Sequence, residues 1–405
     1  MSCSGNGLIS VDQALDAYRV VQPLKTKTVP LMQAHQHYLA ADVVSDIALP
    51  LFTQSAVDGY ALRSDDILAG VTEFELVGEV RAGIAENIQI QSGQCVRIFT
   101  GGRLPDSADT VARQEIMQVT PTKIVLNEPL NKGTDIRYQG EELQVGTPLA
   151  VRGQDLKSGV IAALSMAGVK QVQVFMQPKI AVLITGDEVS QSLDNDAQVF
   201  DANAPMILTW LKEQGFSNIH LEHVVDQREI LTQALKNAFD HYDLVITTGG
   251  VSVGDYDLIR PVSMQLGATE VFWKVAQKPG KPLYFAQYQT ETQQSYLLGL
   301  PGNPAAVFVC LSLHVTALLN ALQGNTQGQP AWKQARLESE VKPDSRDQLL
   351  RMKLAVSHDG QLSVTKLAKQ QSHMLSNLNQ ANVIVRIPMR HAAEATPEYV
   401  SFIEI

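Results

Sequence analysis

Hydrophobic and polar positions follow two patterns in the first part of the chain. Ser10-Val-Asp-Gln13 is followed by apolar Ala14, Leu15 and Tyr18, the pattern of an amphipathic helix with a capping box. Residues 51–140 instead contain short β-like runs, at 74–77, 96–99 and 123–126, separated by glycine, proline, aspartate and asparagine. This spacing predicts a β-rich lobe. A further helix is expected over residues 158–167.

A regular alternation of strand-like and helix-like runs begins after Pro178. Strands are expected at residues 179–184, 219–225, 244–247 and 296–300, and helices at 204–214, at 226–239, after Asp257 and after Pro304. Strands and helices that alternate at this spacing predict a parallel sheet with helices on both faces. The helix at 226–239 starts with Asp226-Gln-Arg-Glu229, a variant of the capping box.

The last part of the chain shows mainly strand patterns. Residues 325–330 form a polar linker that contains glycine and proline. Beyond it, residues 349–356 and 361–367 flank Ser357-His-Asp-Gly360, which is a hairpin signal, and residues 383–387 form another strand-like run. We therefore expect a small β domain at the end of the chain.

Composition and charge restrict the classes of partner. A chain of 405 residues is too long for one compact core, and 45% hydrophobic with 18% charged residues is ordinary for a globular protein. The formal net charge of -10 argues against a broad surface for nucleic acid or for an anionic membrane. A local cationic pocket remains compatible with this charge.

The cysteines and the chain start indicate a cytoplasmic protein. Cys3, Cys95 and Cys310 are far apart, which argues against a disulfide framework or a structural zinc site. Cys310 is expected in the core and Cys95 in strand packing. The first residues have neither the basic nor the apolar region of a signal peptide, so none is expected.

The most apolar late run covers residues 305–322. Four polar residues interrupt it: Ser312, His314, Thr316 and Asn320. The run therefore predicts a buried helix instead of a membrane span.

Three strands of the expected parallel sheet end in unusual turns. The turns are Thr-Gly-Asp-Glu at 185–188, Thr-Gly-Gly-Val-Ser-Val-Gly-Asp at 248–255 and Leu-Pro-Gly-Asn-Pro at 300–304. Ligands of open α/β sheets bind beyond the carboxyl ends of the strands, where these turns lie. We expect all three turns to converge on one crevice.

The residues of these turns combine groups for an anion with groups for a metal. Backbone N–H groups of Gly249, Gly250 and Gly254, together with Ser252, suit a phosphate. Four nearby carboxylates suit a hard cation such as Mg²⁺, which in turn bridges phosphate oxygens. They belong to Asp187, Glu188, Asp255 and Asp257. Three ammonium groups follow, those of Lys274, Lys278 and Lys281.

Each of these features also has a purely structural interpretation. A glycine-rich turn is often only a turn, acids at a helix start often cap its dipole, and lysines often form a solvated face. Three such turns on one sheet favour the functional interpretation. His220 and His223 flank a β-like run with the wrong facing for a metal pair, and no Ser-His-Asp or Cys-His nucleophile arrangement is evident.

The motifs, taken together, resemble those of the molybdopterin molybdenumtransferase family, which includes MoeA and the E domain of gephyrin. The central ones are TGDEV at 185–189, DLVITTGGVSVGDYDLI at 243–259, KPGKPL at 278–283 and GLPGNP at 299–304. Residues 49–61 resemble the family's PPFDNSAMDGYA, and residues 99–115 and 136–142 resemble two further motifs. Residues 371–376 resemble a C-terminal motif that bears serine. The resemblance runs in order over nearly the whole chain.

The resemblance implies a multidomain fold of α/β and β type and an elongated homodimer. Its parts would be a helical linker domain (residues 1–50 and 141–177), a β-rich lobe (51–140), a MogA-like parallel-sheet molybdopterin-binding domain (178–326) and a C-terminal β domain (327–405). In a dimer, the lobe with Asp58 would face the crevice of the partner, so the active site would be shared.

The activity implied by the resemblance is a transferase reaction. The enzyme would take molybdate and adenylylated molybdopterin as substrates, cleave the adenylate with Mg²⁺, release AMP and leave molybdenum on the dithiolene. A molybdopterin adenylyltransferase would act upstream, and molybdoenzymes or cofactor chaperones would act downstream.

The family's functional positions carry over onto this sequence residue by residue. Catalytic roles are implied for Asp58, Asp187, Glu188, Asp257, Lys274 and Lys278, of which Asp187, Glu188 and Asp257 would bind the metal. Substrate-binding roles are implied for Thr100, Arg137, Glu142, Asp226, Gly249, Gly250, Ser252, Gly254, Lys281, Pro301, Pro304, Arg351 and Ser372 or Ser376. Arg351 has the alternative interpretation of a cross-strand partner.

The sequence departs from the family's usual residues at several motif positions. They are Gln54, Val57, Gly102, Arg103, Glu142 and Gln371. Arg103 would add a cation beside the site and Gly102 would loosen its turn. The departures leave open a weakened paralogue that carries or scaffolds the cofactor, and the neighbouring adenylylation step is a third alternative. The intact acids, glycines and lysines favour the transferase.

Overall fold

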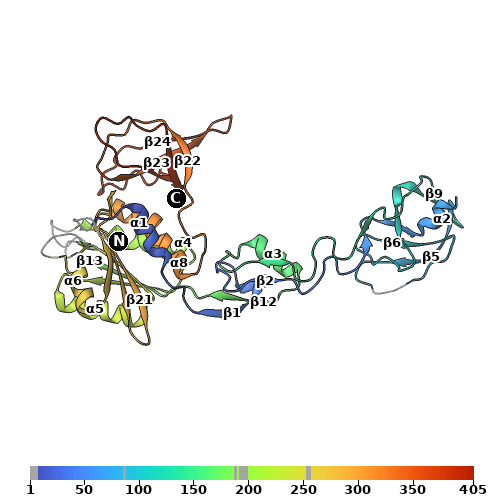
Figure 1. Cartoon of the computed structure of the whole chain (residues 1–405), viewed down its shortest axis with the longest axis horizontal. Coiled ribbons are helices and arrows are strands. Elements are labelled where there is room, and N and C mark those ends of the chain that lie inside the picture. The colour runs from blue at the N-terminus through green and yellow to red at the C-terminus, as the bar shows by residue number, and fades with distance from the viewer. Residues whose placement is uncertain (1–7, 85–87, 187–188, 191–198, 252–256) are drawn as a thin grey trace.

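The computed structural model describes residues 8–84, 88–186, 189–190, 199–251 and 257–405. These residues form an elongated molecule (Figure 1). The parallel sheet and the C-terminal β domain lie at one end, the β-rich lobe lies at the other, and a narrow connecting region joins them.

The first helix, α1 (Val11–Arg19), begins with the predicted capping box. The Ser10 hydroxyl accepts a hydrogen bond from the Gln13 backbone N–H at 3.1 Å, and the Gln13 side chain accepts one from the Ser10 N–H at 2.9 Å. The apolar face of α1 joins the core of the parallel-sheet region, because Val11, Ala14, Leu15 and Tyr18 are buried there. This position differs from the prediction, which placed residues 1–50 in the linker domain.

The connecting region is mixed in structure and not mainly helical. Two antiparallel ladders run through it: β1 (Thr26–Pro30) with β12 (Gln171–Phe175), and β2 (Val43–Val44) with β11 (Pro148–Ala150). The predicted helix at 158–167 is present as α3 (Ser158–Met166), next to the short 3₁₀ turn η1 (Leu31–Gln33). The β-branched residues that alternate in β1 and β12 explain why this part forms strands.

The β-rich lobe is confirmed. Its sheet has the order β7-β4-β6-β5-β9-β8 among the described residues. The strands are β4 (Gly59–Leu62), β5 (Glu73–Val80), β6 (Gln94–Ile98), β7 (Thr110–Arg113), β8 (Met117–Val119) and β9 (Ile124–Leu126), with α2 (Ser64–Leu68) and the 3₁₀ turn η2 (Gln114–Ile116) between them. A separate ladder joins β3 (Gln54–Ser55) to β10 (Ile136–Arg137) where the lobe meets the connecting region.

The central sheet has the order β16-β13-β17-β21-β20-β18 among the described residues. Its strands are β13 (Ile180–Thr185), β16 (Ile219–Val224), β17 (Leu244–Thr248), β18 (Thr269–Trp273), β20 (Tyr284–Gln289) and β21 (Gln294–Leu300). The four predicted strands are parallel to one another, as expected. The antiparallel extension by β20 and β18 was not predicted. A short parallel ladder joins β14 (Val189–Ser190) to β15 (Val199–Phe200).

Helices cover both faces of the central sheet, as predicted. One face packs against α1, α4 (Asn203–Glu213), α7 (Pro304–Cys310), the π-helical turn η3 (Leu311–Val315) and α8 (Thr316–Leu322). The other face packs against α5 (Arg228–His241) and α6 (Ile259–Gln265). The capping box predicted at Asp226 is wrong, because α5 begins at Arg228 and Gln227 at its N-cap makes no side-chain capping bond.

The apolar run that ends the central region is a buried core helix, as predicted. Residues Pro304–Leu322 are long and apolar enough to cross a membrane, but 72% of the most apolar window is buried inside the protein. Cys310 is buried in this helix and Cys95 is buried in β6, which confirms both expectations.

The C-terminal region is a barrel-like β domain that is joined to the central region by a shared strand. β22 (Lys333–Leu337), β23 (Asp347–Val356), β24 (Leu362–Lys366), β25 (Val383–Ile387) and β26 (Tyr399–Glu404) form its sheet, and β23 also pairs with β25. The short strand β19 (Gln277–Lys278) extends this sheet by pairing with β23. The guanidinium of Arg386 also contacts both carboxylate oxygens of Asp12 on α1, at 2.6 and 2.8 Å. The lysine turn therefore lies at the junction of the two regions.

Candidate active site

The three strand-end turns converge, as predicted, in their described residues. The Thr185 hydroxyl donates to the Thr248 carbonyl at 2.9 Å, and the Gly249 N–H donates to the Leu300 carbonyl at 3.1 Å. The Asn203 side chain at the start of α4 donates to the Gly302 carbonyl at 2.9 Å. These bonds connect the carboxyl ends of β13, β17 and β21 at one edge of the sheet.

The glycines of the second turn fit this convergence for steric reasons. Gly249 and Gly250 have φ angles of +80° and +63°, which favour glycine. A Cβ on Gly249 would lie 2.9 Å from the Thr185 hydroxyl oxygen and 3.2 Å from the Thr185 carbonyl oxygen. The close approach of the two turns therefore depends on the missing side chain.

Gly249→Ala is expected to reduce the free energy of unfolding by about 1–3 kcal/mol, since it forces a strained φ and a clash. Chemical denaturation measures this change. Gly159→Ala is the matched control, because Gly159 lies in α3 with open space around its Cβ position. Equal stability of the Gly249→Ala variant and the wild type would contradict the steric account.

Buried polar atoms without partners lie behind these turns. The hydroxyls of Thr247 and Thr248 and the side-chain oxygen of Asn203 have no hydrogen-bond partner among the described residues. Buried polar groups are nearly always hydrogen-bonded, so these three need an explanation. A polar ligand at this edge of the sheet would supply one.

Five of the predicted residues lie outside the described residues: Asp187, Glu188, Ser252, Gly254 and Asp255. Asp257 is described and lies just before α6. Within the described part of the chain, no group of three or more His, Cys, Asp or Glu side chains is placed to hold a metal ion. The predicted metal set therefore stays a prediction.

The three predicted lysines have different surroundings. The Lys278 ammonium lies 2.8 Å from a carboxylate oxygen of Asp344, which belongs to the C-terminal domain. The Lys274 ammonium lies 3.7 Å from the centre of the Trp273 ring, a cation–π geometry. Lys281 is exposed and makes no ion pair with the described residues. Lys281 is therefore the least neutralised cation of the turn.

Asp344 itself is held ionised by its neighbours. Partial burial raises the pKa of its carboxyl, but the hydrogen bond from Lys278 and the charges of Arg346 and Lys278 outweigh burial, so the pKa is lowered. Arg346 contacts the other carboxylate oxygen of Asp344 at 3.3 Å. One carboxylate thus offsets part of the positive charge at the turn.

A cavity of about 750 Å³ opens between the lysine turn and the C-terminal domain. Most of the charged side chains that line it are cationic: Lys278, Lys281, Lys342, Arg346 and Lys366, with Glu340 opposing them. Pro301 and Asn303 of the third strand-end turn and Ser372 of the C-terminal domain also line it. Such a surplus of positive charge in an acidic protein suits an oxyanion.

Ser372 joins this cavity to the strand-end turns. Its hydroxyl accepts a hydrogen bond from the Asn303 side chain at 3.1 Å, and its carbonyl accepts one from the Ala305 N–H at 3.0 Å. Ala305 follows Pro304, which opens α7 at its first position. The cavity and the turns are therefore adjacent parts of one site.

Comparison with known proteins gives the same assignment. Sequence profiles match in order the MoeA N-terminal region (domain I and II) over residues 9–168, the probable molybdopterin binding domain over 181–321 and the MoeA C-terminal region (domain IV) over 334–397. The molybdopterin molybdenumtransferase of Staphylococcus epidermidis is 31% identical over 398 residues, which cover 96% of this chain and 93% of that protein. The chain belongs to the molybdopterin molybdenumtransferase family.

Two further relatives agree with this assignment. The molybdopterin molybdenumtransferase of a Nostoc species is 32% identical and covers 90% of this chain, with 85% of its own length matched. The crystal structure of the MoeA protein of Pyrococcus horikoshii superposes with a TM-score of 0.80 at 25% identity, covering 98% of this chain and 100% of that one. The chain is thus placed among the transferases of molybdenum-cofactor biosynthesis.

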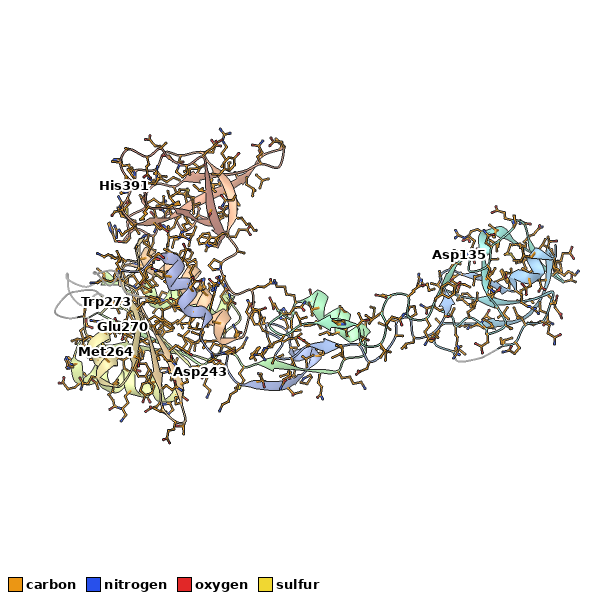
Figure 2. The ribbon with its side chains drawn as sticks, in the orientation of Figure 1. Asp135, Asp243, Met264, Glu270, Trp273 and His391 are labelled. Atoms are coloured by element: carbon orange, nitrogen blue, oxygen red, sulfur yellow. The ribbon has the colours of Figure 1, made fainter. Side chains whose placement is uncertain are left out.

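The molybdenumtransferase motifs of the N-terminal half lie in and beside the distant lobe. Asp58 accepts hydrogen bonds from the backbone N–H and the hydroxyl of Thr100, both at 2.8 Å, and these bonds lower the pKa of its carboxyl. Arg137 and Glu142 are exposed. Figure 2 shows Asp135, which belongs to the same lobe, at the opposite end of the molecule from Trp273. A single chain therefore does not bring these residues to the cavity.

Arg351 and Gly102 have surroundings that the sequence did not predict. Arg351 does not line the cavity: its side chain is fully buried and donates to the Asn377 side chain at 2.9 Å and to the Lys369 carbonyl at 2.9 Å. Its side chain binds a loop, while its backbone pairs with Ile384 of β25, which agrees with the cross-strand interpretation. Gly102 does not loosen its turn, because a Cβ there would lie 2.8 Å from the Phe99 carbonyl oxygen.

For three other residues that the sequence singled out, the structure shows a position and a neighbour but no functional role. Asp226 lies between β16 and α5, where it has an interaction partner. His223 contacts Asp201 at 2.8 Å and His220 contacts Glu222 at 3.5 Å, so each histidine has its own acidic neighbour.

The sequence reasoning missed the contribution of the C-terminal domain to the cavity. Lys342, Arg346 and Lys366 were not predicted, and neither was Asp344. The clustered charges of Lys342-Pro-Asp-Ser-Arg346 were the available signal. Their proximity to the lysine turn follows from the pairing of β19 with β23, which the sequence does not reveal.

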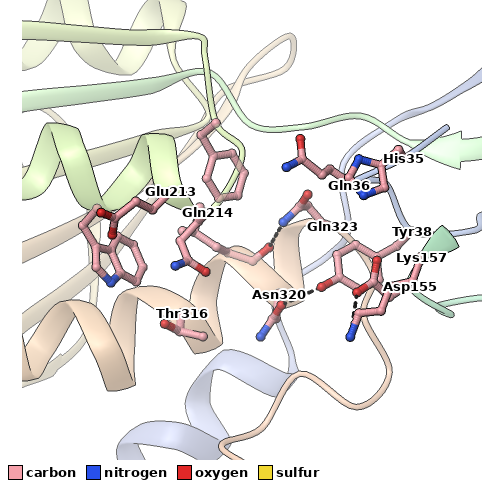
Figure 3. A pocket seen from close by; sticks show the side chains of 13 residues that line it. His35, Gln36, Tyr38, Asp155, Lys157, Glu213, Gln214, Thr316, Asn320 and Gln323 are labelled. Carbon is pink, nitrogen blue, oxygen red and sulfur yellow. Dashed lines mark hydrogen bonds and ion pairs between the residues drawn. The ribbon is translucent and has the colours of Figure 1, made fainter. Parts of the chain in front are cut away.

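A second cavity contains none of the predicted residues. It has a volume of about 280 Å³ and lies between the connecting region and the helices α4 and α8 (Figure 3). Tyr38 reaches across it and donates to the Asn320 side chain at 3.3 Å. The contact ties the connecting region to the central region.

Proposed function

We propose that this chain is an active molybdenumtransferase that inserts molybdate into adenylylated molybdopterin, cleaves the adenylate and releases AMP. The observation that carries this proposal is the cationic cavity, joined through Ser372 and Asn303 to the glycine-bearing strand ends. An oxyanion in the cavity and a phosphate at the strand ends would then be neighbours.

The residues of the cavity suit the handling of molybdate. Lys281 and Lys278 offer ammonium groups, and the Ser372 hydroxyl offers a donor. Positively charged and N–H groups that are already in place stabilise the charge that develops on non-bridging oxygens. The Gly249 and Gly250 turn would hold the phosphate side of the pterin substrate, beside the buried hydroxyls of Thr247 and Thr248.

Mg²⁺ belongs to the same proposal. The donors at this edge suit a hard cation, because Thr247 and Thr248 place hydroxyl oxygens there and Asp187, Glu188 and Asp257 supply carboxylates by sequence. The ion would neutralise phosphate charge while the adenylate is cleaved. Asp187, Glu188 and Asp257 would hold it.

A homodimer would complete the site. Asp58 and Thr100 form a hydrogen-bonded turn of the β-rich lobe, and this lobe lies at the opposite end of the molecule from the central sheet (Figure 1). An antiparallel pair of elongated chains would bring this lobe to the partner's strand ends. We further propose that the protein is cytoplasmic and acts between a molybdopterin adenylyltransferase and the molybdoenzymes or chaperones that receive the cofactor.

Asp344→Asn is expected to tighten molybdate binding about threefold, since it releases Lys278 from a partly exposed ion pair. Isothermal titration calorimetry with molybdate measures the affinity. Asp359→Asn, in the turn between β23 and β24, removes the same charge elsewhere and is the control. Weaker binding by the Asp344→Asn variant would show that this carboxylate helps to hold the ligand.

The proposal is tested by supplying adenylylated molybdopterin, Mg²⁺ and molybdate and reactivating a cofactor-free molybdoenzyme with the product. We expect molybdate-dependent reactivation by the wild type and its loss in Glu188→Ala. Tight binding without product formation would instead establish the carrier or scaffold function that the departures from the family motifs left open.

A further inference from the structure

A buried chain of polar side chains lies beneath the lysine turn and has no part in the site described above. Tyr18, His314 and Gln277 are all fully buried. The Tyr18 hydroxyl lies 3.3 Å from Nδ1 of His314, and Nε2 of His314 lies 2.8 Å from the side-chain oxygen of Gln277. The chain thus joins α1, the π-helical turn and β19, three segments far apart in the sequence.

The donors and acceptors along this chain have one consistent direction. Burial lowers the pKa of His314 to about 3, so the imidazole is neutral at physiological pH. The Tyr18 hydroxyl donates to Nδ1, which leaves the proton on Nε2 to be donated to Gln277. The amide nitrogen of Gln277 then donates to the Gly280 carbonyl at 3.2 Å and approaches the Cys310 sulfur at 3.6 Å.

The helical run Pro304–Leu322 changes from α-helix to a π-helical turn around His314, the residue that it contributes to these hydrogen bonds. Residues Leu311–Val315 form a π-helical turn between α7 and α8, and His314 lies within it. Single π turns inside α-helices are often found at functional sites, because they change the direction of a side chain at a cost in regular hydrogen bonding. Here the turn places His314 between Tyr18 and Gln277.

The lysine turn rests directly on the end of the chain. Gly280 has a φ of +91°, and a Cβ there would lie 2.6 Å from the Gln277 amide nitrogen and 3.0 Å from the Cys310 sulfur. The Val275 N–H donates to the Lys281 carbonyl at 2.9 Å and closes the turn. Lys278 and Lys281 leave this turn on the side of the cavity.

We propose that Tyr18, His314 and Gln277 are positioning residues that fix the Gly280 peptide and thereby place the ammonium groups of Lys278 and Lys281 in the cavity. The inference rests on the proposed function, because the lysines are placed for molybdate. A purely structural role would affect stability without selectivity between the two substrates.

Two variants, Gln277→Met and His314→Leu, remove hydrogen bonds between the three buried side chains. They are compared with His314→Gln, which keeps a hydrogen-bond donor. Ser312→Ala, in the same π-helical turn, is the control. The KM for molybdate and the KM for adenylylated molybdopterin are measured separately, with thermal unfolding alongside. We expect the first two variants to raise the KM for molybdate about tenfold and the KM for the pterin substrate less than about twofold. His314→Gln is expected to restore part of the loss.

Hydrogen exchange of residues 275–283, read by mass spectrometry, needs no substrate. We expect faster exchange in Gln277→Met and His314→Leu than in the wild type and in Ser312→Ala. Unchanged exchange, or equal changes in both KM values, would overturn the positioning of the turn. A wild-type chain that neither binds nor transfers molybdate would overturn the proposed function itself, whatever the exchange experiment shows.

Discussion

Lys281→Met is expected to lower kcat/KM for molybdate by about 100-fold, the scale of losing one charge-stabilising donor in an enzyme site. Lys281 is exposed to the cavity and forms no ion pair with the described residues. Its full charge is therefore available to an oxyanion. Steady-state rates of AMP release at varied molybdate measure the change.

Lys278 provides the comparison for this prediction. Its ammonium is already paired with Asp344 at 2.8 Å, so Lys278→Met is expected to cost less than Lys281→Met. Lys123→Met, in the distant lobe, is the control for loss of a surface charge. Equal losses at Lys278 and Lys281 would show that the ion pair with Asp344 does not persist with substrate present.

Arg351→Met is expected to lower the free energy of unfolding by about 3 kcal/mol, since it leaves buried acceptors without a donor. The guanidinium supports the loop of residues 369–377 through the Lys369 carbonyl and the Asn377 side chain. Burial lowers the pKa of Arg351, and one of its terminal nitrogens has no partner among the described residues. Denaturant unfolding measures the change.

Molybdate affinity, measured alongside stability, separates support of the loop by Arg351 from direct contact between Arg351 and the substrate. The loop supported by Arg351 carries Ser372, so we expect molybdate affinity to fall together with stability. Lys353→Met, two residues further along β23, is the matched control, because its side chain is exposed. An Arg351→Met protein that keeps wild-type stability but loses molybdate binding would return Arg351 to the substrate-binding role that its motif position implies.

Local patterns predicted much of the fold. The capping box at Ser10 and the strand–helix alternation after Pro178 depend on neighbours in the sequence, so the pattern was sufficient. The antiparallel strands β18 and β20 were missed because only the lysine turn between them was interpreted, as a functional feature. The place of α1 was missed because an apolar helix face does not identify the sheet on which it packs.

The strand-end turns of the candidate site could be predicted from the sequence. The residues of the C-terminal domain that line the cavity could not. The meeting of the three turns follows from the polarity of a parallel sheet. The role of the C-terminal domain follows from the pairing of Lys278 with Gln348, a contact between distant segments. The burial of the Arg351 side chain was not predicted, because a motif position gives a residue's place in the sequence and not the direction of its side chain.

In the proposed function, molybdate drives cleavage of the adenylate at this site. The most direct measurement is the release of AMP from adenylylated molybdopterin by the purified wild-type chain, with and without molybdate, in the presence of Mg²⁺. We expect release that depends on molybdate and saturates with it, and that is strongly reduced in Lys281→Met. AMP release that is independent of molybdate, or equal in the two proteins, would contradict the proposed function.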